Sequence, residues 1–273
     1  MLSINTNVSA MIALQSLNAV NRELFEVQRR ISTGLKVSSA KDNGAVWAMA
    51  QGQRAELKSL DAVTGSLSRG QSIVDVAISG GETISDLLTQ MKEKMLAAQD
   101  TSLTVSDRAA LSADYVALRK QIDLAASNAS FNGVSLISSG SSGNVRALAN
   151  ANATSSIDVD HVDLSTTGAL LSGTLADLTT VTAADLTNLD NALKGVNTAV
   201  AKLGTGAKAL DTHQTFISKL QDTLESSIGR LVDADLAKES ARFQALQVKQ
   251  QLAIQALSIA NQQPQLILQL FRN

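Results

Sequence analysis

Apolar side chains recur at alternating steps of three and four residues over most of this chain, and that spacing is typical of a helix packed against another helix. The first series consists of Ala10, Ala13, Leu17, Val20, Leu24, Val27 and Ile31. Gly34 then breaks the pattern, and a loop at 38–44 offers Asp42 or Asn43 as the cap of a second helix. The sequence therefore predicts a partnered helix, a loop and a second helix.

Further segments keep a related register. The second helix should reach about Asp100, with an interruption at Gly80-Gly81 between two apolar stripes. A third helix has Ser106 as its expected cap and ends near SNASFNG at 127–133, a stretch in which Asn132-Gly133 is a strong tight-turn dipeptide. Helical spacing returns over 186–260. The chain therefore has helical segments in both its N-terminal and its C-terminal parts.

Between these parts the composition changes. From Val134 to about Thr182 the chain is rich in Ser, Thr and Gly, and the alternation at 157–162 predicts a small β-hairpin. The only proline is Pro264, so nothing earlier forbids long helices. Antiparallel pairing buries most of the apolar stripes with the fewest crossings. We therefore expect a mainly α fold, a long antiparallel helical rod or coiled coil built from the N- and C-terminal helices, with a β-hairpin insert.

The two ends of the chain are almost free of charge. Residues 1–21 contain no charged side chain, and neither do residues 250–271. Polar residues such as Asn5 and Gln15 interrupt the first segment, which argues against a cleaved secretory signal and against a membrane span. An uncharged polar face is cheap to desolvate when it is hydrogen-bonded. Such ends suit helices that pair with each other and then with copies of the same protein.

Composition limits the classes of function. Five Phe, one Tyr and one Trp among 273 residues are too few to fill a thick globular core, which favours thin helical packing. A net charge of −2 without a long basic run argues against nucleic-acid binding. The absence of cysteine excludes a disulfide framework, a Cys-ligated metal and a thiol nucleophile.

Three short patterns imitate chemical sites. Residues Ser38 to Lys41 fit the S-x-x-K pattern of penicillin-recognising enzymes, but the partner motifs of those enzymes are absent. Residues Gly204 to Ala209 fit G-x-G-x-x-A without a preceding strand. Asp158 and Asp160 lie on the opposite face of a strand from His161, which argues against a shared metal ion. We therefore expect no enzyme activity, no cofactor and no metal.

Four segments, in order, resemble bacterial flagellin: SINTNVSAM at 3–11, RRISTGLKVSSAKDNGAVWAMA at 29–50, NASFNGVSLI at 128–137 and LSIANQQPQLILQLFR at 257–272. The resemblance covers nearly all of both terminal thirds of the chain. The pattern is most similar to the short flagellins of alphaproteobacteria, which lack large outer domains.

The resemblance implies a structural subunit that is exported and polymerises into the extracellular flagellar filament for motility. It implies a filament-core domain of 1–42 with 233–273, a helical rod domain of 43–137 with 183–232, and a Ser/Thr-rich hairpin insert at 138–182. The inner helices would supply the contacts between subunits. The expected subunit-interface residues are Ile4, Leu17, Leu24, Ile31, Leu246, Leu257, Leu266 and Leu270.

The resemblance also implies partners: copies of the same chain, sibling flagellins, a distal filament cap, hook-junction proteins and an export chaperone, but neither nucleic acid nor membrane insertion. Family termini are disordered in the free monomer and fold on assembly. One alternative is a hook–filament junction protein, which would form a collar of few subunits. A second alternative is a hydrolase that uses Ser38 and Lys41. The INTN segment at 4–7 and the LSIANQ segment at 257–262 favour flagellin.

Overall fold

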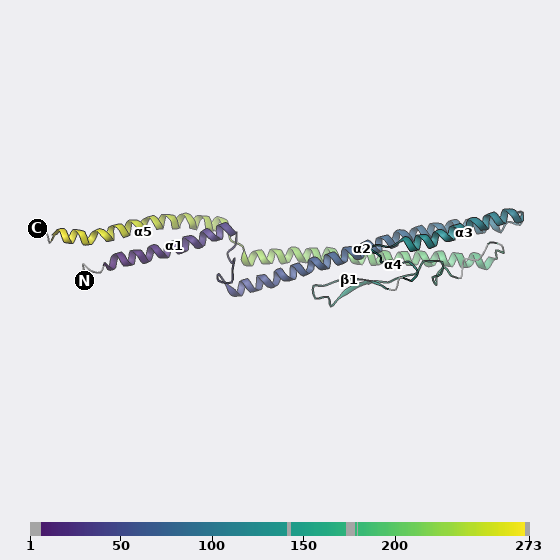
Figure 1. The fold of residues 1–273 in the computed structure, drawn as a ribbon, viewed down its shortest axis with the longest axis horizontal. Helices are drawn as coiled ribbons and strands as arrows, with labels where there is room; N and C mark the ends of the chain where they lie inside the picture. The colour runs from purple at the N-terminus through teal and green to yellow at the C-terminus, as the bar shows by residue number, and fades with distance from the viewer. Residues whose placement is uncertain (1–6, 141–142, 173–177, 179, 271–273) are drawn as a thin grey trace. The chain divides into compact units, whose positions relative to one another are not determined.

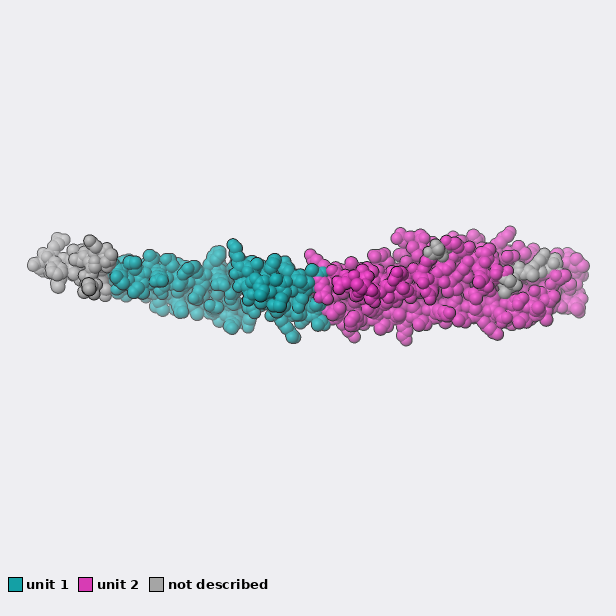
Figure 2. Space-filling model, turned by 90° about the horizontal axis from the view of Figure 1, so that it is seen from below, with its two compact units in different colours: residues 1–55, 223–273 teal, residues 56–222 magenta. Residues whose placement is uncertain are grey.

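The computed structural model describes residues 7–140, 143–172, 178 and 180–270, and for 263–270 it describes the backbone alone. Within these residues, the order of elements is α1 (Val8–Thr33), α2 (Gly44–Ala98), α3 (Val105–Asn128), β1 (Val145–Leu148), β2 (Ser156–Val159), α4 (Ala183–Val232) and α5 (Leu236–Leu270) (Figure 1). The chain forms two compact units, unit 1 with residues 1–55 and 223–273, and unit 2 with residues 56–222 (Figure 2). The predicted mainly helical fold with a small hairpin is confirmed.

Unit 1 contains α1 and α5 side by side in opposite directions (Figure 1). Asn7 caps α1 by accepting a hydrogen bond from the backbone N–H of Ala10 at 3.0 Å, and its amide donates to the carbonyl of Ala260 at 2.7 Å. Gly34 ends α1 in the left-handed conformation, with φ of 70°. The predicted first helix and its end at Gly34 are therefore confirmed.

Helices α1 and α5 keep a seven-residue spacing where they meet. Every member of the predicted series from Ala10 to Ile31 is buried or half-buried. The partner series on α5 advances by alternating steps of four and three and consists of Glu239, Phe243, Leu246, Gln250, Ala253, Leu257 and Ala260. This regular spacing gives α1 and α5 the packing of a coiled coil. We refer to the meeting line of the two series as the seam.

The two helix breaks of unit 1 are tied together by backbone hydrogen bonds. The N–H of Lys36 donates to the carbonyl of Val232 at 2.7 Å, and the N–H of Ala234 donates to the carbonyl of Gly34 at 2.9 Å. Leu35 and Asp233 form an antiparallel bridge between these bonds. The segment that follows α1 and the segment that precedes α5 are therefore held side by side, and we call these two segments together the joint.

The loop after this joint is organised by Asp42. Its carboxylate accepts hydrogen bonds from the backbone N–H groups of Ser38 and Ser39, both at 3.0 Å, and from the guanidinium of Arg29. Asn43 caps α2 instead, because its side chain accepts from the N–H of Val46 at 3.1 Å. Of the two expected caps, Asn43 is confirmed, and Asp42 holds the loop against α1.

These bonds predict a pH-dependent effect of Asp42→Asn. The guanidinium of Arg29, followed by the groups of Ser39 and Ser38, holds the pKa of the Asp42 carboxyl well below its usual range. The charged form therefore stabilises the fold above the unfolded pKa of about 4, and that contribution is lost as the pH falls through the folded value. We expect a lower melting temperature for Asp42→Asn at pH 7 and a difference that shrinks below about pH 4. Thermal unfolding followed by circular dichroism measures both. The control is Asp222→Asn, which changes an exposed carboxylate on α4. If this variant lowered the melting temperature at pH 7 as much as Asp42→Asn does, without any dependence on pH, the stabilising role assigned to the Asp42 carboxylate would be contradicted.

Unit 2 is organised by the antiparallel pairing of α2 with α4. Four cross-helix contacts join Asp61 to Gln221, Ser68 to Gln214, Ser85 to Asn197 and Lys92 to Asp190. Each step along α2, of seven, seventeen and seven residues, is matched by the same step backwards along α4. The two helices therefore keep one register without slippage between the first contact and the last.

The buried face of α2 in unit 2 follows alternating steps of three and four without a break. It consists of Leu60, Val63, Leu67, Gly70, Val74, Ala77, Gly81, Ile84, Leu88, Met91, Met95 and Ala98. The predicted interruption at Gly80-Gly81 is wrong, because α2 is continuous there. A Cβ on Gly81 would lie 2.6 Å from Cγ2 of Val200, and one on Gly80 would lie 2.7 Å from Cβ of Ala129. These glycines permit close packing rather than ending the helix.

The third helix, α3, packs in unit 2 beside α2. The ammonium of Lys94 on α2 forms an ion pair with Asp114 on α3 at 2.7 Å. The predicted cap Ser106 is wrong: Thr104 caps the helix in a reciprocal capping box with Asp107. Asn132-Gly133 forms the predicted turn, with φ of 51° and 78°.

The insert completes the core of unit 2. Strands β1 and β2 pair antiparallel, with Val145 opposite Val159. The backbone N–H of Leu148 donates to Ser66 Oγ at 3.1 Å, and His213 Nε2 lies 2.7 Å from the carbonyl oxygen of Ala149. The hairpin is therefore anchored to both α2 and α4. The insert and the segment before it also bury apolar side chains, namely Leu136, Ile137, Val145, Ala147, Val159, Leu164, Leu171 and Leu178.

Candidate assembly surface

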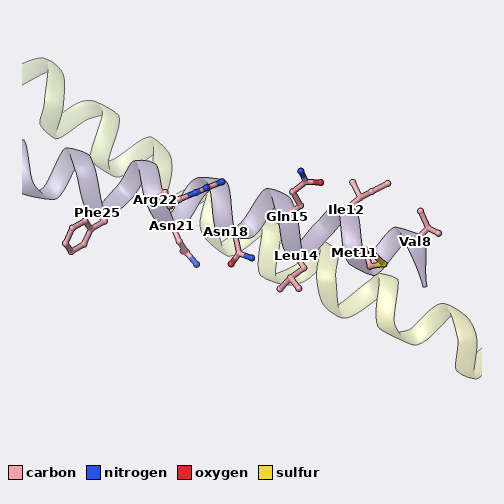
Figure 3. A pocket seen from close by; sticks show the side chains of 9 residues that line it. All are labelled: Val8, Met11, Ile12, Leu14, Gln15, Asn18, Asn21, Arg22 and Phe25. Atoms are coloured by element: carbon pink, nitrogen blue, oxygen red, sulfur yellow. The ribbon is translucent and has the colours of Figure 1, made fainter. Parts of the chain in front are cut away.

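One side of α1 exposes large apolar side chains to solvent. We call this the outer face of α1; its apolar members are Val8, Met11, Ile12, Leu14 and Phe25. Phe25 is 72% exposed, Met11 65% and Leu14 48%. The same face includes the polar side chains of Gln15, Asn18, Asn21 and Arg22 (Figure 3). Together these residues line a shallow groove along the helix.

The outer face has its own seven-residue spacing. Positions 11, 18 and 25 form one row, positions 14 and 21 a second, and positions 8, 15 and 22 a third. These rows do not include any member of the seam. The helix is therefore apolar on two sides, one of which is covered by α5.

The partner helix α5 also exposes apolar side chains that do not belong to the seam. They are Leu236, Val248, Leu252, Ile254 and Ile259, and each is at least half exposed. A monomer rarely leaves so many large apolar side chains in water unless they mark an interaction site. Unit 1 therefore has exposed apolar surface on both α1 and α5.

Charge is sparse on this surface. Among the residues that the structure describes, Arg22 is the one charged residue that lines the α1 groove. Within the described residues, the charged side chains of unit 1 gather instead near the joint, where Arg30 pairs with Glu26 at 2.8 Å and with Glu239 at 3.3 Å. A surface of this kind can be covered by another apolar helix without desolvating many charges.

The predicted subunit-interface residues are distributed as follows. Leu17, Leu24 and Ile31 on α1 are half-buried in the seam; on α5, Leu246 is buried and Leu257 half-buried. Ile4 and the side chains of Leu266 and Leu270 lie outside the described residues. The described members thus hold α1 against α5 within one chain. Their role between chains stays a prediction.

Sequence reasoning did not find the outer face of α1. The signal was present, since Met11, Asn18 and Phe25 repeat every seven residues beside the stronger series. Asparagine and glutamine at the intervening positions make this second stripe look polar. It becomes visible as an apolar surface only when exposure is known residue by residue.

The imitation motifs have structural roles. The hydroxyls of Ser38 and Ser39 hydrogen-bond to Asp42 at 3.0 and 3.3 Å, which holds the loop. Residues Gly204 to Ala209 lie inside α4, as their helical spacing predicted. Within the described part of the chain, no group of three or more acidic or histidine side chains is placed to hold a metal ion. In the same residues, no helix has both the length and the apolar character needed to cross a bilayer.

Comparison with known proteins identifies this arrangement. Residues 4–142 match the family model for the bacterial flagellin N-terminal helical region, and residues 186–271 match that for the C-terminal helical region. The chain belongs to the bacterial flagellin family. This flagellin is 54% identical to flagellin FljK of Caulobacter vibrioides over 99% of its own length and 98% of the relative's. It is 38% identical to a flagellin of Brucella melitensis over the whole of both chains.

The structural comparison agrees with the family. The crystal structure of Bacillus cereus flagellin superimposes with a TM-score of 0.50 at 22% identity, over 55% of this flagellin and 86% of that chain. The likeness shows a shared helical fold. Because the alphaproteobacterial relatives match end to end, this is a short flagellin, as its motifs indicated. Flagellins are structural subunits of the extracellular flagellar filament, and this chain is such a subunit.

Proposed function

We propose that this flagellin polymerises by covering the outer face of α1 and the exposed apolar side chains of α5 with the helices of neighbouring copies. The observation that supports this most directly is the exposure of Met11, Leu14 and Phe25 on a helix whose opposite side is already packed. Contacts that repeat without closing into a ring produce a helical polymer. The filament-core domain would then be 1–42 with 233–273.

The seam and the outer face have separate roles in this proposal. The seam holds α1 and α5 together, and this pairing leaves the outer face of α1 and the exposed apolar side chains of α5 to contact other copies. The seam includes Leu17, Leu24, Ile31, Leu246 and Leu257. Ile4, Leu266 and Leu270 would extend the same packing. The pair of α1 and α5 buries little apolar area by itself, so the entropy lost when its helices become ordered is offset fully only when neighbouring copies bury more apolar area against it. Assembly and the ordering of the ends are therefore coupled.

The remaining roles follow from the family. The chain would leave the cell unfolded through the flagellar type III apparatus with an export chaperone, and would join sibling flagellins between hook-junction proteins and a distal cap. Motility would follow from torque that the polymer transmits. In this proposal the chain carries no catalytic activity, and the hydroxyls of Ser38 and Ser39 serve the loop through Asp42.

Seeded growth tests this function. Purified full-length chain is added to short filament seeds, and length is followed by negative-stain electron microscopy. We expect long, uniform filaments whose length increases with added monomer. Short collars that stop growing after few subunits would support the hook-junction alternative and contradict the proposal.

A further inference from the structure

The methionines of this flagellin differ sharply in exposure. Met91 and Met95 lie in the core of unit 2, where they are 0% and 1% exposed. Met11 and Met49, both in unit 1, are 65% and 53% exposed. Oxidation of a methionine depends on access to its thioether sulfur. Among the described methionines, peroxide should therefore react with Met11 and Met49 and spare the two in the core.

Met11 differs from Met49 in its surroundings. It lies on α1 beside Ile12 and Leu14, in the row that continues to Phe25, and Figure 3 shows it among the side chains of the outer face. Met49 lies on α2 and is not part of that face. Of the methionines that the structure describes, only Met11 therefore combines an accessible sulfur with a position in the surface through which the chain is proposed to assemble.

The chemistry changes that surface directly. A sulfur lone pair attacks one oxygen of hydrogen peroxide, the O–O bond breaks, and the second oxygen leaves as water after proton transfer. The apolar thioether becomes a sulfoxide, which is polar and accepts strong hydrogen bonds. Burial of a polar group without a partner opposes association. A sulfoxide at Met11 would place such a group in the middle of an apolar contact.

We propose that Met11 is a peroxide-sensitive modification site that decides whether a free chain can enter the filament. The inference rests on the proposed function of the outer face. Oxidation of the free chain blocks its addition, whereas a chain already in the filament has Met11 covered and is protected. Methionine sulfoxide reductase reverses the modification, so oxidation delays assembly without destroying the subunit.

Seeded growth after peroxide treatment tests the proposal. Full-length chain, Met11→Leu and Met49→Leu are each treated with hydrogen peroxide, freed of it and added to untreated seeds. Leucine keeps the apolar volume and cannot be oxidised. We expect elongation of treated native chain and treated Met49→Leu to slow at least about tenfold, while treated Met11→Leu grows at its untreated rate. Methionine sulfoxide reductase should restore the native rate.

Peptide mass mapping supplies the second readout. Added oxygen should appear at Met11 and Met49 in the free chain but not at Met91 or Met95, and Met11 in intact filaments should oxidise at least about tenfold more slowly. Equal inhibition of treated Met11→Leu, or unchanged growth of native chain with Met11 oxidised, would overturn the inference and leave the proposed function intact. Failure of untreated native chain to elongate seeds would instead overturn the proposed function.

Discussion

Glutamates at both Leu14 and Phe25 are expected to abolish seeded filament growth while the free chain keeps its fold. The two side chains are 48% and 72% exposed in the single chain, so their replacement removes little packing from unit 1. In a filament the same positions would be covered by a neighbour. An unpaired carboxylate buried in an apolar contact costs several kcal/mol. The two together should lower the elongation rate at least about 100-fold.

The matched control keeps the positions and restores the apolar surface. Leu14→Met with Phe25→Leu retains most of the buried area and introduces no charge, so it should elongate seeds within a few-fold of the native rate. Circular dichroism of both double variants as monomers should match the native spectrum. Normal growth of the glutamate variant would show that assembly does not use the outer face of α1.

Replacement of Gly81 by alanine should destabilise unit 2. The added Cβ would lie 2.6 Å from Cγ2 of Val200, a distance at which either the Val200 side chain or one of the helices must shift. Overpacking of this kind costs about 1–3 kcal/mol, against which the alanine recovers about 0.5–1 kcal/mol of helix propensity. We expect a net loss in the free energy of unfolding, measured by chemical denaturation of the monomer.

Two companion variants make the test specific. The same substitution at Gly204, also inside a helix of unit 2 but with no atom within 4 Å of the added Cβ, should raise stability by about 0.5–1 kcal/mol. Val200→Ala should reduce the cost of the alanine at Gly81, because it removes the atom that the new Cβ meets. Equal effects at Gly81 and Gly204 would show that only helix propensity matters.

The sequence was sufficient for the elements whose cause is local and periodic. Heptad spacing placed the helices, and the Asn132-Gly133 turn followed from the backbone freedom of its two residues. The prediction at Gly81 was wrong because glycine usually weakens a helix. The position of Gly81 in the sequence nevertheless fits the alternating steps of three and four that connect Val74 with Ile84. The close approach of Val200, which favours a glycine at this position, depends on the tertiary packing of α4 against α2 and cannot be deduced from the local sequence.

Two other features show where local reasoning ends. Thr104 and Asp107 form a capping box that their spacing in the sequence could have revealed. Ser106, however, is an equally acceptable capping residue when it is considered alone. The buried Leu164 and Leu171 stand among serines and threonines without regular spacing, so no pattern marks them as core. The outer face of α1 could not be predicted for a further reason. Its apolar residues can be recognised as an unpaired surface only when α5 is known to cover the other side of α1.

The strict register between α2 and α4 has a consequence for how such a chain can change in length. Seven residues added to α2 alone would keep the same face of that helix buried. Every residue of α2 beyond the insertion would, however, lie opposite a different residue of α4 than before. Only a matched addition of seven residues to each helix, placed at paired points such as those near Ser85 and Asn197, would preserve all four cross-helix contacts. Unit 2 can therefore lengthen by heptads only when both helices gain the same number of residues. An insertion in one place alone should be tolerated better in the hairpin insert than in either helix.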